Sequence, residues 1–249
     1  MAHCAGIGII CKTPKSGVSK TRLHGVLGSE AAAELAGCCL TDVADSIASI
    51  PGTIGVRGYA VFSPEGSETE LRRFLPENFE LICRRDATLG VVLLGATQAL
   101  LDLGNDCAVL VNADSPTLPR ALLEQTIEKL RAPGDRMILG PAIDGGYYLI
   151  GLKQAHARVF QDIAWSTSAV LQTTIVRAGE IGLPVEVLSP WYDIDDAASL
   201  QTLVDDVQRD IRPEDCGTLA SGPARATRKF LARHPELDGR LALALASAR

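Results

Sequence analysis

The sequence predicts an α/β fold in which a mostly parallel, mixed central sheet is covered by helices on both faces. Short apolar segments alternate with segments of helical length over about 200 residues, which is typical of strands joined by right-handed crossovers. The run "CAVLVNAD" (107–114) is continuously apolar before its polar end, as expected of a strand buried on both faces of a parallel sheet. With 249 residues and 47% hydrophobic content, the chain can bury a full core.

The elements follow in order along the chain. "GIGIIC" (6–11) is short, apolar and β-branched, and therefore predicts a strand. The alanine-rich segment 29–48 has the length and composition of a helix, and Pro119 suits the first turn of a later one. The further strands are expected at 53–62, 79–84, 107–114, 136–142, 147–152 and 184–189. The further helices are expected near 68–75 and at 90–103, 118–131, 168–181 and 196–209.

The regular alternation ends near residue 209. Pro213, Gly217, Gly222 and Pro223 interrupt it before a final helical pattern that begins at 225. We therefore expect one main domain over 1–209 and a helical C-terminal appendage over 210–249.

The composition of the chain excludes several functional classes of protein. The net charge of -6 argues against a general binder of nucleic acid or of membrane surfaces, because such proteins need a broad positive field. The seven cysteines form no CxxC pair and their odd number indicates reduced thiols. No signal peptide and no long apolar stretch is present, so a cytoplasmic location is expected. A homo-oligomer is compatible with all of this.

A cationic loop follows the first predicted strand. "KTPKSGVSKTRL" (12–23) carries four cationic side chains and a glycine, at a place where backbone amides near a helix start add positive potential. We interpret this loop as a phosphate site. The alternative is a solvated basic loop. The nucleotide-binding candidates in it are Lys12, Lys15, Gly17, Lys20 and Arg22.

Two common nucleotide motifs are excluded. A P-loop needs glycine at the positions that Pro14 and Ser19 occupy before Lys20-Thr21. "GIGIIC" lacks the third glycine of a dinucleotide fingerprint and lies within a strand rather than after it.

Carboxylates follow other strands of the predicted sheet, where ligands of open α/β sheets bind. Asp114 ends the 107–114 strand together with Asn112, and Asp193 and Asp195 precede the helix at 196–209. Carboxylates from separate strand ends, without a histidine cluster, suit Mg²⁺ or Mn²⁺ that also binds phosphate oxygens. The alternatives are an Asx turn at Asp114 and, for the neighbouring Asp196, a helix N-cap.

The segment "GPAIDGGYYLIGL" (140–152) places two glycines beside two tyrosines between predicted strands. Gly145 and Gly146 allow a ligand to approach the backbone closely, and Tyr147 or Tyr148 could line a pocket. A hairpin turn is the simpler interpretation, and the spacing does not choose between them.

Taken in order, "KTPKSGVSKTRL", "ADSPTLP", "GPAIDGGYYLIGL", "WSTSAVLQTT" and "DIDDAASL" resemble a family of bacterial glycosyltransferase-A-like proteins, known as nucleotide-diphospho-sugar transferases. The resemblance spans roughly residues 6–204, and more distantly it extends to molybdenum-cofactor nucleotidyltransferases and phospholactate guanylyltransferases. It implies a nucleotide-binding sheet with a metal near Asp114 and the D-x-D pair Asp193 and Asp195. It also implies substrate-binding residues at Asp144, Gly145, Gly146, Tyr147 and Trp165.

The sequence departs from the family pattern at two places. Relatives read L-G-x-R-M where this chain has "LGVVLL" (89–94), so an arginine is missing for which Arg84 or Arg85 could substitute. Relatives also tend to have glycine where Asn112 stands. Either change could alter nucleotide choice or weaken activity.

Three functional hypotheses follow. The first is a metal-dependent glycosyltransferase in which Asp114, Lys20 and Arg22 are catalytic, with metal and cations stabilising the leaving nucleoside diphosphate. The second is transfer of a nucleotidyl group from a nucleoside triphosphate to a phosphorylated acceptor. The third is a catalytically silent nucleotide-binding domain. The expected partners are a nucleotide donor and a small-molecule acceptor.

Overall fold

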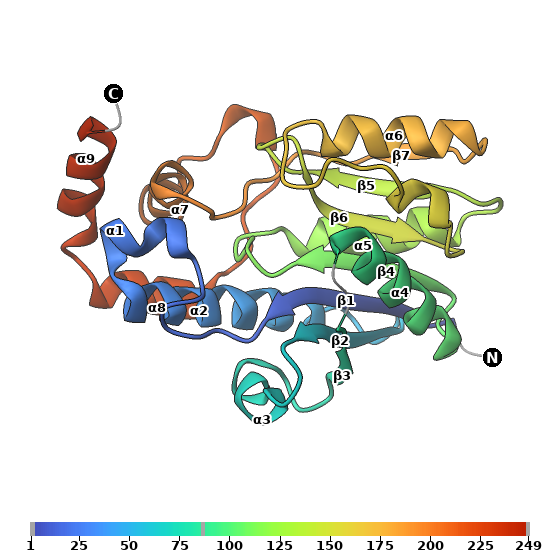
Figure 1. The fold of residues 1–249 in the computed structure, drawn as a ribbon, viewed down its shortest axis with the longest axis horizontal. Coiled ribbons are helices and arrows are strands. Elements are labelled where there is room, and N and C mark those ends of the chain that lie inside the picture. Colours follow the sequence, from blue (N-terminus) through green and yellow to red (C-terminus); the bar gives the residue numbers. More distant parts are fainter. Residues whose placement is uncertain (1–2, 86–87, 248–249) are drawn as a thin grey trace.

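The computed structural model describes residues 3–85 and 88–247 and shows one seven-stranded sheet between layers of helices (Figure 1). The strand order is β3-β2-β1-β4-β6-β5-β7. The strands are β1 (Ala5–Lys12), β2 (Val56–Ser63), β3 (Glu80–Cys83), β4 (Cys107–Asn112), β5 (Met137–Pro141), β6 (Tyr147–Leu152) and β7 (Val185–Val187).

Helices connect the strands. They are α1 (His24–Leu27), α2 (Ser29–Ala48), α3 (Glu68–Leu71), α4 (Leu89–Asp102), α5 (Arg120–Arg131), α6 (Val170–Glu180), α7 (Ala197–Arg209), α8 (Arg225–Arg233) and α9 (Leu237–Ser247). Every predicted strand and helix has an observed counterpart. The main shifts are at α3, which ends at Leu71 and continues as a 3-10 turn to Phe74, at β2, which begins at Val56 rather than at 53, and at β4, which ends at Asn112 rather than at 114.

The sheet is mixed, as predicted, with one strand reversed. β1 pairs in parallel with β2 and β4, and β5 pairs in parallel with β7. β6 is antiparallel to both β4 and β5 because the tight turn after β5 returns the chain directly. That turn requires glycine at Gly145, whose φ of 94° lies in the left-handed region. The carboxyl ends of six strands therefore meet at the edge where β6 begins.

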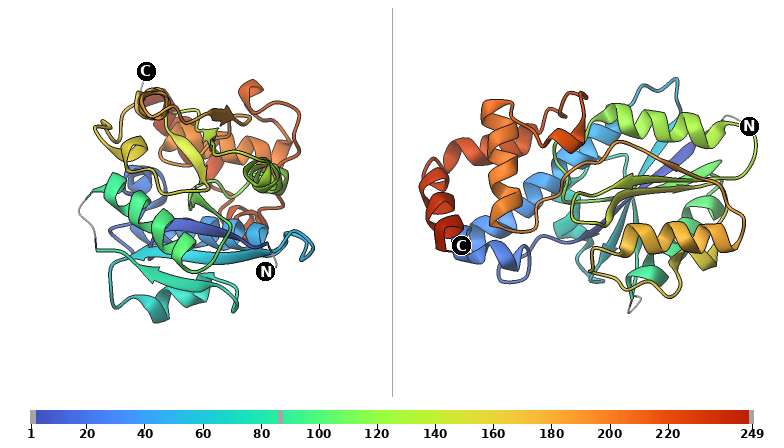
Figure 2. Two further views of the ribbon diagram at one scale, coloured as in Figure 1. Left: turned by 90° about the vertical axis from the view of Figure 1, so that its right-hand side faces the viewer. Right: turned by 90° about the horizontal axis from the view of Figure 1, so that it is seen from above.

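Two apolar clusters occupy the two faces of the sheet. Buried residues of α2 and α5 pack on one face, with Leu35, Leu40 and Ile127 fully buried among them. Buried residues of α4 and α6 pack on the other face, against Tyr59 and Leu110 among others. Figure 2 shows α5 and α6 on opposite sides of the sheet, which is the three-layer arrangement expected from the alternation of strands and helices.

The C-terminal segment is helical: α8 packs against α2, and α9 packs against α1 and α7. Asp42 of α2 accepts hydrogen bonds from the backbone N–H groups of Ala226 and Thr227, both at 2.8 Å, and so satisfies the start of α8. Phe230 and Leu241 are fully buried in the same cluster as α2 and α7. The boundary at residues 209 and 210 between two units stays a prediction.

Two local predictions concern the helix cap at Asp196 and the state of the cysteines. Asp196 is the N-cap of α7, where its carboxylate accepts a 2.9 Å hydrogen bond from the N–H of Ser199, so the predicted cap is confirmed. All seven cysteines, each within the described residues, are free thiols. Among the same residues, no helix is both long and apolar enough to cross a membrane.

Candidate nucleotide and metal site

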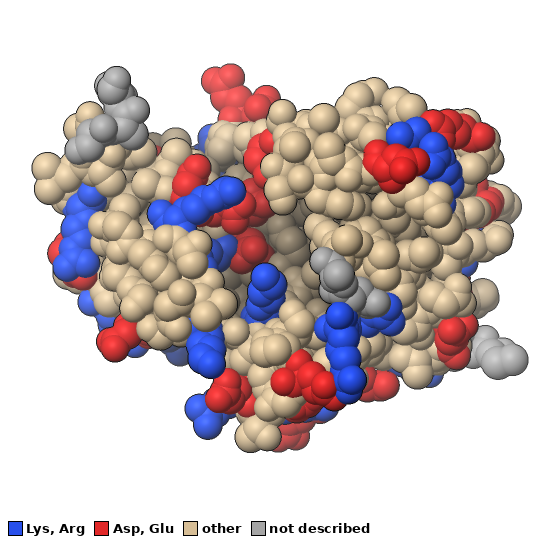
Figure 3. Space-filling view, in the orientation of Figure 1, with Lys and Arg blue, Asp and Glu red and all other residues tan. Residues whose placement is uncertain are grey.

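A pocket of about 860 Å³ opens at the carboxyl ends of β1, β2, β3 and β4. Figure 3 shows a hollow on this face with Lys and Arg on one part of its wall and Asp and Glu on another. Within the described residues, the charged ones that line it are five cations, Lys12, Lys20, Arg22, Arg84 and Arg85, and three carboxylates, Asp114, Asp195 and Glu65, of which Glu65 forms an ion pair with Arg85. Ligands of open α/β sheets bind at this edge, which is where the cationic loop was predicted to act.

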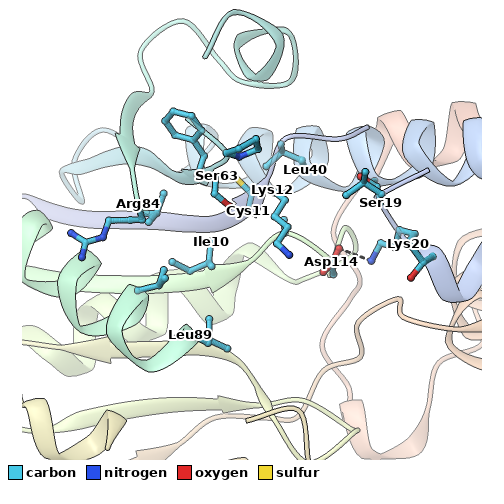
Figure 4. A pocket seen from close by; sticks show the side chains of 18 of the residues that line it. Ile10, Cys11, Lys12, Ser19, Lys20, Leu40, Ser63, Arg84, Leu89 and Asp114 are labelled. Atoms are coloured by element: carbon cyan, nitrogen blue, oxygen red, sulfur yellow. Dashed lines mark ion pairs between the residues drawn. The ribbon is translucent and has the colours of Figure 1, made fainter. Parts of the chain in front are cut away.

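The cationic loop contributes three of its four charged residues to the pocket. Lys12, at the end of β1, is exposed, and its side chain forms no hydrogen bond or ion pair within the described residues. Figure 4 shows its ammonium and that of Lys20 approaching Asp114 from opposite sides. Lys15 and Gly17 are exposed on the outer part of the loop and do not line the pocket. Gly17 has a φ of 79°, so its role in the structure is to turn the loop.

Lys20 links the loop to the acidic side of the site. Its side chain is only 6% exposed, and its Nζ lies 2.5 Å from Oδ1 of Asp114 while donating to the carbonyl of Ile194. Burial alone would lower the pKa of this ammonium, but the carboxylate of Asp114 outweighs it and raises the pKa. Lys20 adopts a left-handed backbone with φ of 50°, a conformation that the two contacts of its side chain stabilise. It is therefore charged and fixed in position.

Three carboxylates meet beside the pocket. Ligand oxygens of Asp144, Asp193 and Asp195 all lie within 4.8 Å of one another. The backbone explains this proximity, because Ala142 and Trp191 form a parallel bridge. Asp144 lies two residues after Ala142 and Asp193 lies two residues after Trp191, so the bridge brings these two side chains together. The N–H of Ile194 donates to the carbonyl of Asp114 at 3.0 Å, which ties the end of β4 to the same segment.

The electrostatics of these carboxylates favour a cation. Burial raises the pKa of Asp193 to about 7, and the charges of Asp144, Asp195 and Asp114 add to the shift. Burial also raises the pKa of Asp195, partly offset by Lys20. Within the described residues only Arg22, whose Nη1 is 3.8 Å from Asp195, forms an ion pair with the three. An all-oxygen set with uncompensated negative charge fits Mg²⁺ or Mn²⁺.

The carboxylates that cluster in the structure are not the same set as those that the sequence predicted to bind the metal. Asp114 is paired with Lys20 and is not one of the three clustered carboxylates, whereas Asp144, predicted to bind substrate, is. Asp144 also accepts a 2.8 Å hydrogen bond from the N–H of Gly146, as expected of a hairpin turn.

The remaining residues predicted to bind substrate are Gly145, Tyr147 and Trp165. Gly145 packs against the backbone of Ser168, and a Cβ on Gly145 would lie 2.4 Å from that residue's carbonyl oxygen. Tyr147 and Trp165 form an edge-to-face pair with ring centroids 6.4 Å apart. Neither ring lines the large pocket.

Other residues of the pocket had weaker signals in the sequence. Arg84 and Arg85 line it from the end of β3. They are the two residues that we considered as substitutes for the arginine that this chain lacks relative to the family pattern. Leu89 and Val92 of α4 add an apolar wall that no motif indicated. Asn112 lies outside the lining, and its buried Oδ1 accepts no hydrogen bond from any residue that the structure describes.

Comparison with known proteins agrees with the predicted resemblance at the level of the fold. A family profile, DUF2064, described as "Uncharacterized protein conserved in bacteria", matches residues 47–167, which is just under half of the chain. No curated protein matches the sequence.

Solved structures share the fold at low sequence identity. A provisionally assigned nucleotide-diphospho-sugar transferase from Desulfovibrio desulfuricans G20 is 24% identical, with a TM-score of 0.81 over 96% of this chain and 99% of that one. A CMP:2-keto-3-deoxy-manno-octonic acid synthetase complexed with CTP is 12% identical, with a TM-score of 0.55 over 84% of this chain and all of that one. A cytidylyltransferase from Leptospira borgpetersenii serovar Hardjo-bovis is 11% identical, with a TM-score of 0.52 over 95% and 97%. The α/β fold is that of the nucleotide-diphospho-sugar transferases.

Proposed function

We propose that this protein is a metal-dependent transferase that acts on a nucleotide-activated donor. The observation that carries the proposal is the meeting of five cationic side chains and a cluster of carboxylates at one edge of the sheet. A nucleotide phosphate chain needs cationic partners, and carboxylates can hold a divalent cation against the same phosphates. The fold of the solved relatives supports this class of ligand.

The residues divide into three tasks. Asp193 and Asp195, with Asp144 or Asp114, would hold Mg²⁺ or Mn²⁺, which when bound neutralises charge that develops on phosphate oxygens. Lys12 and Arg22 extend into the pocket, where they would bind phosphate oxygens directly. Lys20 stabilises the carboxylate of Asp114 and keeps the cationic loop against the acidic segment. The apolar wall at Leu89 and Val92 provides a surface for a nucleobase.

Glycosyl transfer from a nucleotide-diphospho-sugar is the first candidate reaction. In it the donor leaves as a nucleoside diphosphate, whose developing negative charge Arg22 and Lys12 are placed to stabilise. No protein nucleophile is required for this role. The strong fold similarity to the Desulfovibrio protein supports this candidate.

Nucleotidyl transfer is the second candidate, and one observation favours it. Arg84 and Arg85 add to the three cations of the loop, and a triphosphate carries more negative charge than a diphosphate. In this reaction an acceptor phosphate attacks the α-phosphorus and the cations stabilise the departing pyrophosphate.

A ligand panel distinguishes these reactions. Melting curves with Mn²⁺ and either nucleoside triphosphates or nucleotide sugars report binding, because a bound ligand raises the melting temperature by mass action. Stabilisation by nucleotide sugars supports the first candidate, whereas stabilisation only by triphosphates supports the second. Products of the stabilising donor with acceptors are then followed by mass spectrometry. A nucleotide that binds without turnover of any donor would favour a silent binding domain. If neither ligand class shifts the melting curve, the proposed function is wrong.

A further inference from the structure

A buried chain of hydrogen bonds lies directly behind the carboxylate-bearing segment. The indole Nε1 of Trp191 donates to Oγ1 of Thr117 at 3.2 Å, and that hydroxyl lies 2.7 Å from the phenol oxygen of Tyr192. The Tyr192 hydroxyl lies 2.6 Å from the carboxylate of Asp206, which Ser221 also approaches at 2.7 and 2.8 Å. Asp206 and Thr117 are essentially inaccessible to solvent.

The donors and acceptors fix the direction of this chain. An indole N–H only donates and a carboxylate only accepts, so Trp191 donates to Thr117 and Tyr192 donates to Asp206. The Thr117 hydroxyl therefore donates to Tyr192, and each hydroxyl accepts one bond and donates one. Buried bonds that run in one direction polarise one another, and a single lost member leaves a buried partner unsatisfied.

The chain connects segments that carry the acidic residues of the site. Thr117 lies three residues after Asp114, and Tyr192 immediately precedes Asp193. The far end belongs to the C-terminal segment, since Ser221 donates to Asp206 and the N–H of Gly222 donates to the carbonyl of Thr117 at 2.7 Å. Tyr192 therefore links the segment that contains Asp114 to the segment that contains Asp193.

We propose that Tyr192 is a positioning residue that sets the divalent-cation affinity of the carboxylate cluster through its hydrogen bonds to Thr117 and Asp206. This inference rests on the proposed metal site. Residues that orient metal ligands through hydrogen bonds without touching the metal alter metal affinity when they are replaced. The C-terminal segment contributes through Ser221 and Arg212, which both contact the carboxylate of Asp206.

The test compares two tyrosines that are equally buried. Tyr192→Phe removes the hydroxyl between Thr117 and Asp206, whereas Tyr59→Phe removes a buried hydroxyl that accepts a 3.0 Å bond from Asn105 at the opposite end of the sheet. Tyr192→Phe loses two buried hydrogen bonds, one of them to a carboxylate, and Tyr59→Phe loses one, so we expect both variants to melt below the wild type and Tyr192→Phe to melt lower than Tyr59→Phe. Mn²⁺ alone is titrated into the full chain, and free Mn²⁺ is followed by electron paramagnetic resonance.

We expect Tyr192→Phe to weaken Mn²⁺ binding by about tenfold or more, and Tyr59→Phe to leave it within about twofold of the wild type. Equal Mn²⁺ affinities of the two folded variants would overturn the positioning role while leaving the metal site in place. A wild-type protein that binds no Mn²⁺ would overturn both the metal site and this inference. Should Tyr192→Phe fail to fold, Ser221→Ala gives the same test, with weaker Mn²⁺ binding expected and unchanged affinity refuting the role.

Discussion

Replacing Asp193 by asparagine should stabilise the protein in the absence of metal. Burial and three neighbouring carboxylates raise the pKa of Asp193 from its ordinary 3.8 to about 7, a shift that corresponds to about 4 kcal/mol of destabilisation when the group is ionised. Its carboxylate forms no hydrogen bond or ion pair within residues 3–85 and 88–247, so an amide of similar shape loses no such partner. Because water reaches the cluster and screens its charges, we expect about half of that figure, about 2 kcal/mol at pH 8.

The pH dependence follows from the raised pKa. The folded wild type binds the proton more tightly than the unfolded chain does, so the destabilisation is fully present above about pH 7 and declines as the pH falls toward 4. Asp193→Asn lacks this dependence. We therefore expect the variant to melt about 4–8 °C above the wild type at pH 8 with EDTA, and the difference to narrow at pH 5.

Calorimetric melting from pH 5 to pH 8 measures both quantities. Asp162→Asn is the control, because Asp162 is exposed and Arg158 holds the pKa of its carboxyl below the ordinary value, outside this pH range. The same Asp193→Asn variant should bind Mn²⁺ more weakly, so stability and binding change in opposite directions. A variant that melts at or below the wild-type temperature at pH 8 would refute the reasoning.

Four further substitutions test the site and the residues beside it. Asp114→Asn leaves the buried ammonium of Lys20 without its carboxylate, so we expect a loss of about 2 kcal/mol by chemical denaturation and loss of nucleotide-linked Mn²⁺ binding by calorimetry. Unchanged nucleotide-linked affinity in the folded variant would remove Asp114 from the site. Asp196→Ala should cost about 1 kcal/mol as a lost helix cap and leave Mn²⁺ affinity unchanged. Lys12→Ala should weaken nucleotide binding by about tenfold without changing the melting temperature, whereas Lys15→Ala, outside the pocket, should change neither. Equal effects of these two lysine substitutions would contradict the phosphate role of Lys12.

The order of the elements and the edge of the sheet that carries the site were predictable from the sequence. Apolar runs followed directly by Lys12 and by Asp114 identify strand ends, and parallel strand ends must share one edge. Asp196 was predictable as a helix cap because its role depends only on the residues next to it.

The grouping of the carboxylates was not predictable in the same way. Asp144 comes beside Asp193 because the chain just after β5, at Ala142, pairs with the chain after β7, at Trp191. The register of that bridge has no local signature, since the two residues are far apart in the sequence. The contact of Lys20 with Ile194 is equally non-local, and no spacing rule could have indicated that the ammonium would be buried.

The contact between Lys20 and Ile194 also has a consequence for how the protein is made. These residues are separated by 174 positions, so at a synthesis rate of about 5–20 residues per second the cationic loop emerges from the ribosome many seconds before the segment that contains Ile194. Until then Asp193 and Asp195 do not exist, and of the carboxylates of the site only Asp114 and Asp144 are present to oppose the cations. The site is consequently assembled late, after the central strands β1 and β4 can already pair.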